Sequence, residues 1–317
     1  MSKDREYAAR LLLAWLNERY SRAFALEPGD GEVWDAVDGG DRLALFVAPL
    51  FEPNEAWDGL RGELEVRLDQ ARPGSYLLWL PPGSALPDEE PELSEFVRRV
   101  VLGASRLASG RSGEVRLPAK LMLGKVRDEG GYASVTGGLG RYWTEIAQRL
   151  QGSFYLDSRG LNRFTRDEQE RAQLYDHIGM LSQGLQSGDA VEFEHEDAWT
   201  VQRLPRGAAA QGMTDGWAIT GCPPGFDPND GAQLRRVLRR RLAAAADALK
   251  DRRDTIRTVV LVGAYDYMAG ETAGPAMRGF DPSLTLPFDI IALVSDAEVK
   301  PLLLSRSLNL ADASVRQ

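Results

Sequence analysis

The stretch "VWDAVDGGDRLALFVAPLF" (Val33–Phe51) decides most of what the sequence says about the fold. Its first part alternates between apolar and polar residues, and its second part is an almost unbroken apolar run. Gly39-Gly40 separates the two parts, which is typical of a tight turn between antiparallel strands. We therefore predict one strand near residues 32–37 and a second strand near 42–50.

The second strand has no polar face in the run "LALFV". Both of its sides must leave water, so we expect Leu43, Leu45 and Val47 to be buried on one face and Phe46 on the other. Asp38 and Asp41 flank the two glycines. We expect their carboxylates to accept local backbone N–H bonds in the turn, and we expect no metal site there.

Outward from this stretch, helical and strand patterns alternate along the chain. Apolar spacing, acidic first turns and proline or glycine breaks predict helices over 4–24, 55–71, 88–109, 139–150, 166–187 and 229–251. Apolar and β-branched runs predict further strands near 75–81, 153–157, 189–196, 198–204, 215–220, 256–264 and 288–294, with a hairpin over 114–136. The alternation indicates an α/β fold, with a mixed α+β fold as the alternative.

Two parts of the chain resemble each other. "DRLALFVAPLFEPNEAWDGLRGELEVRLDQA" starts at Asp41, and "DGWAITGCPPGFDPNDGAQLRRVLRRRLAAA" starts at Asp215. Pro49 matches Pro223 and Leu60 matches Leu234 at a spacing of 174 residues. This predicts an internal duplication with two α/β units of mixed sheets flanked by helices, an acidic unit over 1–150 and a unit with an Arg-rich helix over 151–317. The alternative is that both segments only share the residues that favour a helix start.

Composition excludes several classes of function. A single cysteine rules out an intramolecular disulfide, and with only two histidines we expect neither a structural zinc site nor a cofactor. We expect His195, which has acids around it, on a strand surface. No run of 18 apolar residues exists, and "LLLAWL" is too short for a secretory signal, so we predict a cytoplasmic protein with no membrane contact.

Charge is uneven along the chain. The net charge is −9, and the first hundred residues hold 20 of the 47 acids but only 11 of the 38 basic residues. The first third therefore repels polyanions. The basic patch with the best spacing is Arg235, Arg236, Arg239 and Arg240, which share one face of the helix predicted over 229–251. This patch is where nucleic acid or an acidic partner would bind; the alternative is a solvated face, or one docked on the acidic first third.

A second candidate binding site follows the strand at 153–157. Asp157 ends that strand, and the next loop presents Arg159, Asn162 and Arg163. Loops after strand ends are where α/β proteins place their sites, and two arginines can hold a phosphate or carboxylate. The alternative is that Asp157 and the arginines pair with each other and fix the loop.

The order of helix (4–24), two strands (32–50), helix and strand resembles the restriction-endonuclease-like (PD-(D/E)XK) core. In that family an acid on the first strand and an acid-x-Lys on the next bind a divalent metal, and Asp35 stands at the first position. The second position holds Phe46-Val47-Ala48, and no lysine lies between Lys3 and Lys120. The resemblance thus implies a degenerate core that has lost nuclease activity.

Together these features predict a non-catalytic binding or scaffolding protein for an unknown protein or anionic ligand. The alternative is a metal-dependent nuclease or phosphoesterase whose carboxylates come from separate elements. In that case Asp35 would act with Glu6 or Glu18 of the first helix, because Mg²⁺ needs two or three carboxylate oxygens.

Overall fold

In a computed structural model, the described residues are 3–27, 31–51, 54–81, 84–161, 163–164, 167–205, 215–221, 231–252, 254–263 and 280–305. The chain divides into a first unit of residues 1–113 and 200–317 and a second unit of residues 114–199. The boundary predicted at residue 150 thus differs from this division and lies inside the second unit. Both boundaries fall within strands, where no linker composition marks them.

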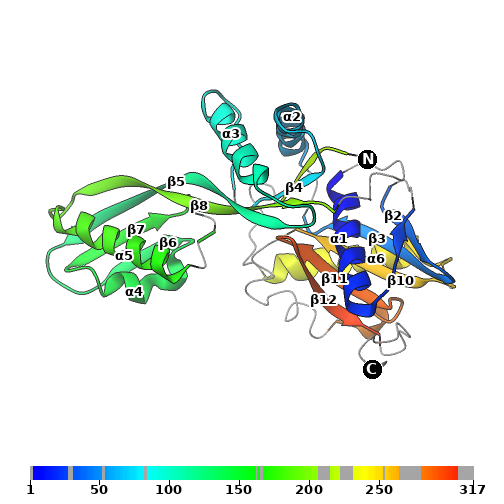
Figure 1. The fold of residues 1–317 in the computed structure, drawn as a ribbon. Helices are drawn as coiled ribbons and strands as arrows, with labels where there is room; N and C mark the ends of the chain where they lie inside the picture. The colour runs from blue at the N-terminus through cyan, green and yellow to red at the C-terminus, as the bar shows by residue number, and fades with distance from the viewer. Residues whose placement is uncertain are drawn as a thin grey trace, which may run out of the picture. The chain divides into compact units, whose positions relative to one another are not determined.

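The strands that the structure describes form two mixed six-stranded sheets flanked by helices, which confirms the α/β class (Figure 1). The helices are α1 (Lys3–Tyr20), α2 (Glu55–Ala71), α3 (Glu92–Ser105), α4 (Trp143–Ala147), α5 (Glu168–Gln183) and α6 (Gly231–Ala248). The first sheet has the order β1 (Ala25–Leu26), β2 (Val33–Asp38), β3 (Asp41–Pro49), β10 (Ile256–Val262), β11 (Ile290–Ser295) and β12 (Glu298–Leu304). The second sheet has the order β6 (Ala133–Gly137), β7 (Ser153–Ser158), β5 (Ser112–Arg127), β8 (Ala190–Arg203), β4 (Tyr76–Trp79) and β9 (Trp217–Thr220).

The hairpin of β2 and β3 forms as predicted. The strands are antiparallel, with Asp38 opposite Asp41 and Gly39 at a φ of 60°, the left-handed region that glycine favours. Leu43, Leu45 and Val47 are fully buried in one apolar cluster with α1, β2 and β10. Phe46 is buried as well, so neither side of this strand meets water, which confirms the prediction.

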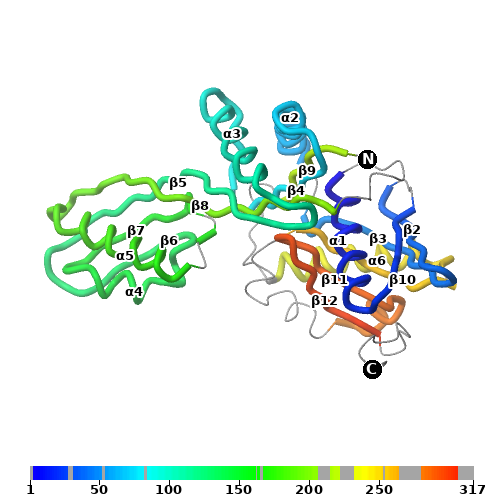
Figure 2. Tube along the Cα trace, viewed as in Figure 1, coloured from blue at the N-terminus to red at the C-terminus, as the bar shows by residue number. Residues whose placement is uncertain are grey.

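The two segments with similar sequences each form a strand, a helix and a strand, namely β3–α2–β4 and β9–α6–β10. β3 pairs in parallel with β10, and β4 pairs in parallel with β9 (Figure 2). The first strand of each segment therefore lies beside the last strand of the other. Two copies related by an approximate two-fold axis would pair in this reciprocal way. A common origin of the two segments stays a prediction.

The hairpin predicted over 114–136 is wrong. β5 pairs antiparallel with β7, and β6 pairs in parallel with β7, so β7 lies between the two predicted partners. The turn residues of "RDEGGY" reverse the chain, but they do not determine which strands become neighbours. The strands predicted at 189–196 and 198–204 are one strand, β8. None of the helices in the described ranges is long and apolar enough to cross a bilayer.

Candidate functional site

The described residues of the loop after β7 have partners within the chain. Arg159 binds Asp157 through its Nε, at 2.9 and 3.0 Å from the two carboxylate oxygens, and this hydrogen bonding lowers the pKa of Asp157 to about 2. Arg163 is buried, and its backbone N–H donates to Asp197 of β8 at 2.7 Å. Asn162 lies outside the described residues. Asp157 and Arg159 thus satisfy each other.

The acids of the opening hairpin are held by arginines. Asp35 pairs with Arg252 at 3.3 Å. Arg22, in the chain after α1, pairs with both Asp38 and Asp41, and its hydrogen bond lowers the pKa of Asp38. Asp38 also accepts the backbone N–H of Ala23 at 3.2 Å. The expected bonds within the turn are therefore replaced by bonds to a segment that sequence spacing did not point to.

Two of the three acids of α1 are also paired. Glu6 is fully buried and forms an ion pair with Arg10, one turn further along the helix. Asp4 pairs with Arg61 of α2 at 3.2 Å, yet burial raises its pKa because desolvation outweighs the attraction of the guanidinium. Glu18 is exposed. Within the described ranges, no three His, Cys, Asp or Glu side chains are grouped so that they could hold a metal ion.

Helix α2 covers the free edge of β9 with its side chains. Asp69 accepts the backbone N–H of Trp217 at 2.6 Å, and Glu65 accepts that of Ile219 at 2.8 Å. Arg61 donates to the Ile219 carbonyl at 3.3 Å. Burial raises the pKa of Glu65. These charged groups take the place of a neighbouring strand, so they stabilise an edge strand that would otherwise expose unpaired backbone groups.

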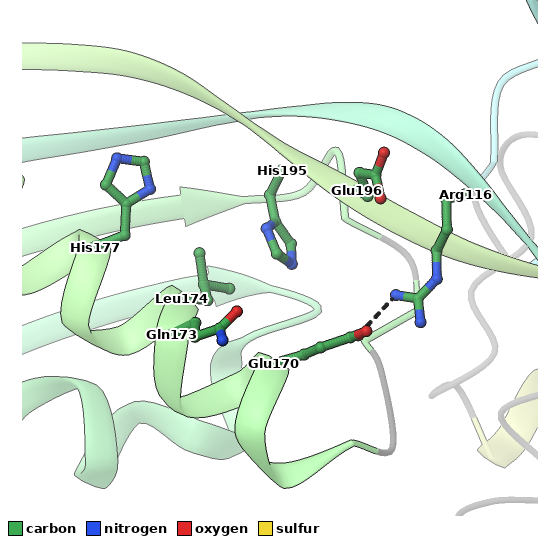
Figure 3. A pocket seen from close by; sticks show the side chains of 7 residues that line it. All are labelled: Arg116, Glu170, Gln173, Leu174, His177, His195 and Glu196. Atoms are coloured by element: carbon green, nitrogen blue, oxygen red, sulfur yellow. Dashed lines mark ion pairs between the residues drawn. The ribbon is translucent and has the colours of Figure 1, made fainter.

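The second unit contains a hollow of about 440 Å³. Figure 3 shows it beneath β5 and β8, with α5 on the other side. Both histidines of the chain line it. The lining residues, called the histidine hollow below, are Arg116, Glu170, Gln173, Leu174, His177, His195 and Glu196.

Local structure explains how these side chains come together. Asp167 caps α5 by accepting the backbone N–H groups of Gln169 and Glu170, which fixes where the helix begins. Glu170, Gln173 and His177 then follow at spacings of three and four residues, so they share one helix face. On β8, His195 lies two residues after the buried Phe193 and therefore on the same face of the strand.

The hollow combines charge with apolar contact. Arg116 binds Glu170 at 3.0 Å across the hollow. Burial lowers the pKa of His195 although Glu196 opposes the shift, so His195 is neutral at pH 7. The His195 ring lies 5.8 Å from the ring of Phe164, and the His177 ring lies 5.6 Å from that of Phe193, centroid to centroid.

Among the described residues, no carboxylate accepts a hydrogen bond from either imidazole, whereas a catalytic histidine is oriented by such an acid. Their ring nitrogens are therefore available to a ligand. Besides the histidines, the lining holds one arginine and two glutamates, so its formal charge is −1. The arrangement favours binding of a small polar molecule.

Sequence reasoning missed this hollow. His195 lies on a strand as expected, but it is half-buried and faces α5. The spacing of Glu170, Gln173 and His177 on one helical face was the available signal. That signal becomes informative only once α5 is known to cover β8, which the local pattern does not reveal.

The Arg-rich helix is α6, and its arginines differ in environment. Arg236, Arg239 and Arg240 are exposed, and Arg235 is half-buried. The guanidinium groups of Arg235 and Arg239 lie over the ring of Phe280, at 5.9 and 5.2 Å from its centroid.

Comparison with known proteins gives no match: the chain matches no family model, no curated protein and no solved structure. A function for this chain is therefore inferred from the geometry of its sites.

Proposed function

We propose that this chain is a non-catalytic binding protein and that the histidine hollow holds its ligand. The observation that carries the proposal is the convergence of both histidines, one arginine, one glutamine and two glutamates on a single hollow. Its volume of about 440 Å³ is in the range of sites for small molecules. Leu174 supplies apolar surface in the lining, and Phe164 and Phe193 contact the two histidine rings.

The charges define the kind of ligand. His195 is neutral at pH 7, and the hollow keeps one net negative charge besides the histidines. A ligand with a carboxylate or phosphate would meet two carboxylates and only one guanidinium in the lining, so its negative charge is disfavoured. A small neutral or cationic molecule can instead donate to the carboxylates and exchange hydrogen bonds with the imidazoles and with Gln173.

The ion pairs of the first unit support a binding role over nuclease catalysis. Asp35, the acid at the position that the nuclease-like resemblance indicates, is bound by Arg252, and Glu6 is bound by Arg10. Releasing either carboxylate for a metal would leave an unpaired arginine, which for the buried pair costs several kcal/mol. These contacts favour a first unit that serves as a scaffold over one that binds a catalytic metal.

The binding proposal is tested with a thermal-shift screen of small amines, amides and alcohols. Gln173 is exposed at the hollow, and Gln173→Trp should fill it, whereas Met180→Trp places the same side chain on an exposed position of α5 outside the hollow. A ligand at 100 times its Kd should stabilise wild type and Met180→Trp by about 2.7 kcal/mol. Equal stabilisation of Gln173→Trp would place the ligand elsewhere and contradict the proposal.

The competing hypothesis, a metal-dependent nuclease or phosphoesterase, has its own test. Cleavage of DNA or of a phosphodiester that depends on Mn²⁺ and is lost in Asp35→Ala would establish it. The binding proposal expects no such cleavage from wild type.

A further inference from the structure

A second feature, independent of the histidine hollow, is a face of α6 with three arginines that no carboxylate among the described residues binds. It consists of Arg235, Arg236 and Arg239, called the arginine face below. The opposite side of the helix is anchored in the first unit. Leu234, Leu238 and Leu242 are fully buried there, and Arg241 donates to the carbonyls of Pro49 and Phe51 at 2.9 and 3.0 Å. The arginine face is therefore presented by a fixed helix.

Other helices of the chain neutralise their arginines locally. An acid three or four residues away binds the guanidinium in α1, α2, α3 and α5, as in Arg10–Glu6, Arg67–Glu63, Arg98–Glu95 and Arg171–Glu168. No acid stands three or four residues from any member of the arginine face. Within the described ranges, no carboxylate pairs with Arg235, Arg236 or Arg239. In a chain of net charge −9, this local exception indicates that the acid partner comes from another molecule.

The like charges also destabilise the free helix. Arg235 and Arg239 are four residues apart on this helix, and such a pair of equal charges opposes helix formation. An anion bound between them removes this repulsion. The repulsion between these arginines therefore destabilises the helix, and binding of an anion removes that destabilisation.

Phe280 shapes the face for a particular anion. The guanidinium groups of Arg235 and Arg239 both lie over its ring, and these cation–π contacts favour their placement. A contact with a ring face uses none of the N–H groups of a guanidinium, so they stay free for two parallel bonds to a phosphate. Residues four apart lie about 6 Å apart along the helix axis, so the face offers a row of phosphate sites.

We propose that the arginine face binds a single-stranded nucleic acid segment through its phosphates. From Arg235 to Arg239 the face spans about 6 Å along the helix, which matches about two successive phosphates of one strand. A duplex would bring further phosphates against a chain whose first hundred residues hold 20 acids and 11 bases. An acidic peptide offers carboxylates at irregular spacing, so it fits the row of guanidinium groups less well.

Fluorescence anisotropy with a labelled ten-nucleotide oligo-dT, from 20 to 200 mM salt, tests the proposal. The full chain should bind, and Arg236→Gln/Arg239→Gln should weaken binding at least tenfold. The slope of log K against log salt should fall by about 1.4, since each phosphate contact on a single strand contributes about 0.7. Arg236→Lys/Arg239→Lys keeps the charge but loses the fork, and it should recover only part of the affinity.

The matched control is Arg98→Gln/Arg99→Gln, which removes the same charge from arginines that Glu95 already binds. Its affinity should stay within twofold of wild type. Circular dichroism melts verify that all variants fold, because Arg236 and Arg239 are exposed. No binding at 20 mM salt, an equal loss in the control, or full recovery by lysine would overturn the proposal. Equal affinity for a labelled ten-residue poly-glutamate would also overturn it and assign the face to acidic proteins.

Discussion

The buried pair of Glu6 and Arg10 gives the sharpest prediction about the first unit. Glu6 has no exposed surface and Arg10 has a side-chain exposure of 7%, so the charges stabilise each other out of water. Arg10→Met keeps the volume of the side chain but removes the cation. The remaining carboxylate is then buried without a counter-charge, which destabilises the fold by about 3–5 kcal/mol.

The double variant Glu6→Leu/Arg10→Met should recover most of this loss. The pair is not ideally satisfied, because Glu6 Oε2 and Arg10 Nε have no hydrogen-bond partner. Replacing an imperfect buried ion pair by apolar side chains of similar size is neutral or stabilising in general. We therefore expect the double variant within about 1 kcal/mol of wild type, and a coupling energy of about 3–5 kcal/mol between the two sites.

Urea unfolding followed by tryptophan fluorescence measures these free energies. The control is Arg98→Met in the exposed pair of Arg98 and Glu95, whose unfolding midpoint should not change measurably. A loss below about 1 kcal/mol for Arg10→Met would show that Glu6 does not depend on its arginine. A double variant as unstable as the single one would show that Glu6 has a structural contact besides the ion pair. Either result would refute the reasoning.

Three further predictions concern the second unit. Gly137 has a φ of 84°, and an added Cβ would overlap the backbone of Ser158 and Arg159, so Gly137→Ala should cost more than about 1 kcal/mol in urea unfolding. Because burial lowers the pKa of His195, its neutral imidazole contributes to the free energy of unfolding at pH values above the unfolded-state pKa of about 6.5. This contribution is lost as the pH falls through the folded-state pKa. Between pH 7.5 and 5, His195→Asn should therefore lose less unfolding free energy than wild type. Arg159→Gln should raise the pKa of Asp157 from about 2 towards 3.8, as measured by a carboxyl carbon NMR titration.

The sequence was sufficient to predict strands, helix starts and turns that depend on a few adjacent residues. The run "LALFV" in β3 predicts burial on both faces because no polar side chain interrupts it. The acidic start of α2 and the turn at Gly39 are similar cases, since capping and turn geometry depend on a few adjacent residues.

Features that depend on long-range packing could not be predicted. Asp35 is bound by Arg252, 217 residues further along the chain, and Asp38 by a segment after α1. β7 lies between β5 and β6 because of how the second unit packs, which turn residues do not report. The histidine hollow likewise needs α5 to lie across β8. His177 and His195 are 18 residues apart, and nothing in that spacing indicates that they share a hollow.

The histidines themselves provide the most direct test of the binding account. Because the chain has only two, a protein labelled with ¹³C-histidine gives two resolvable imidazole signals, and both report on the hollow. Small neutral and cationic molecules are added in turn, in the presence of Mg²⁺, while the signals of protein and ligand are followed for hours. We expect a ligand that shifts both imidazole signals with one Kd and whose own signals stay unchanged. Ligands that leave both imidazole signals in place, or a ligand that is converted to product, would contradict the account.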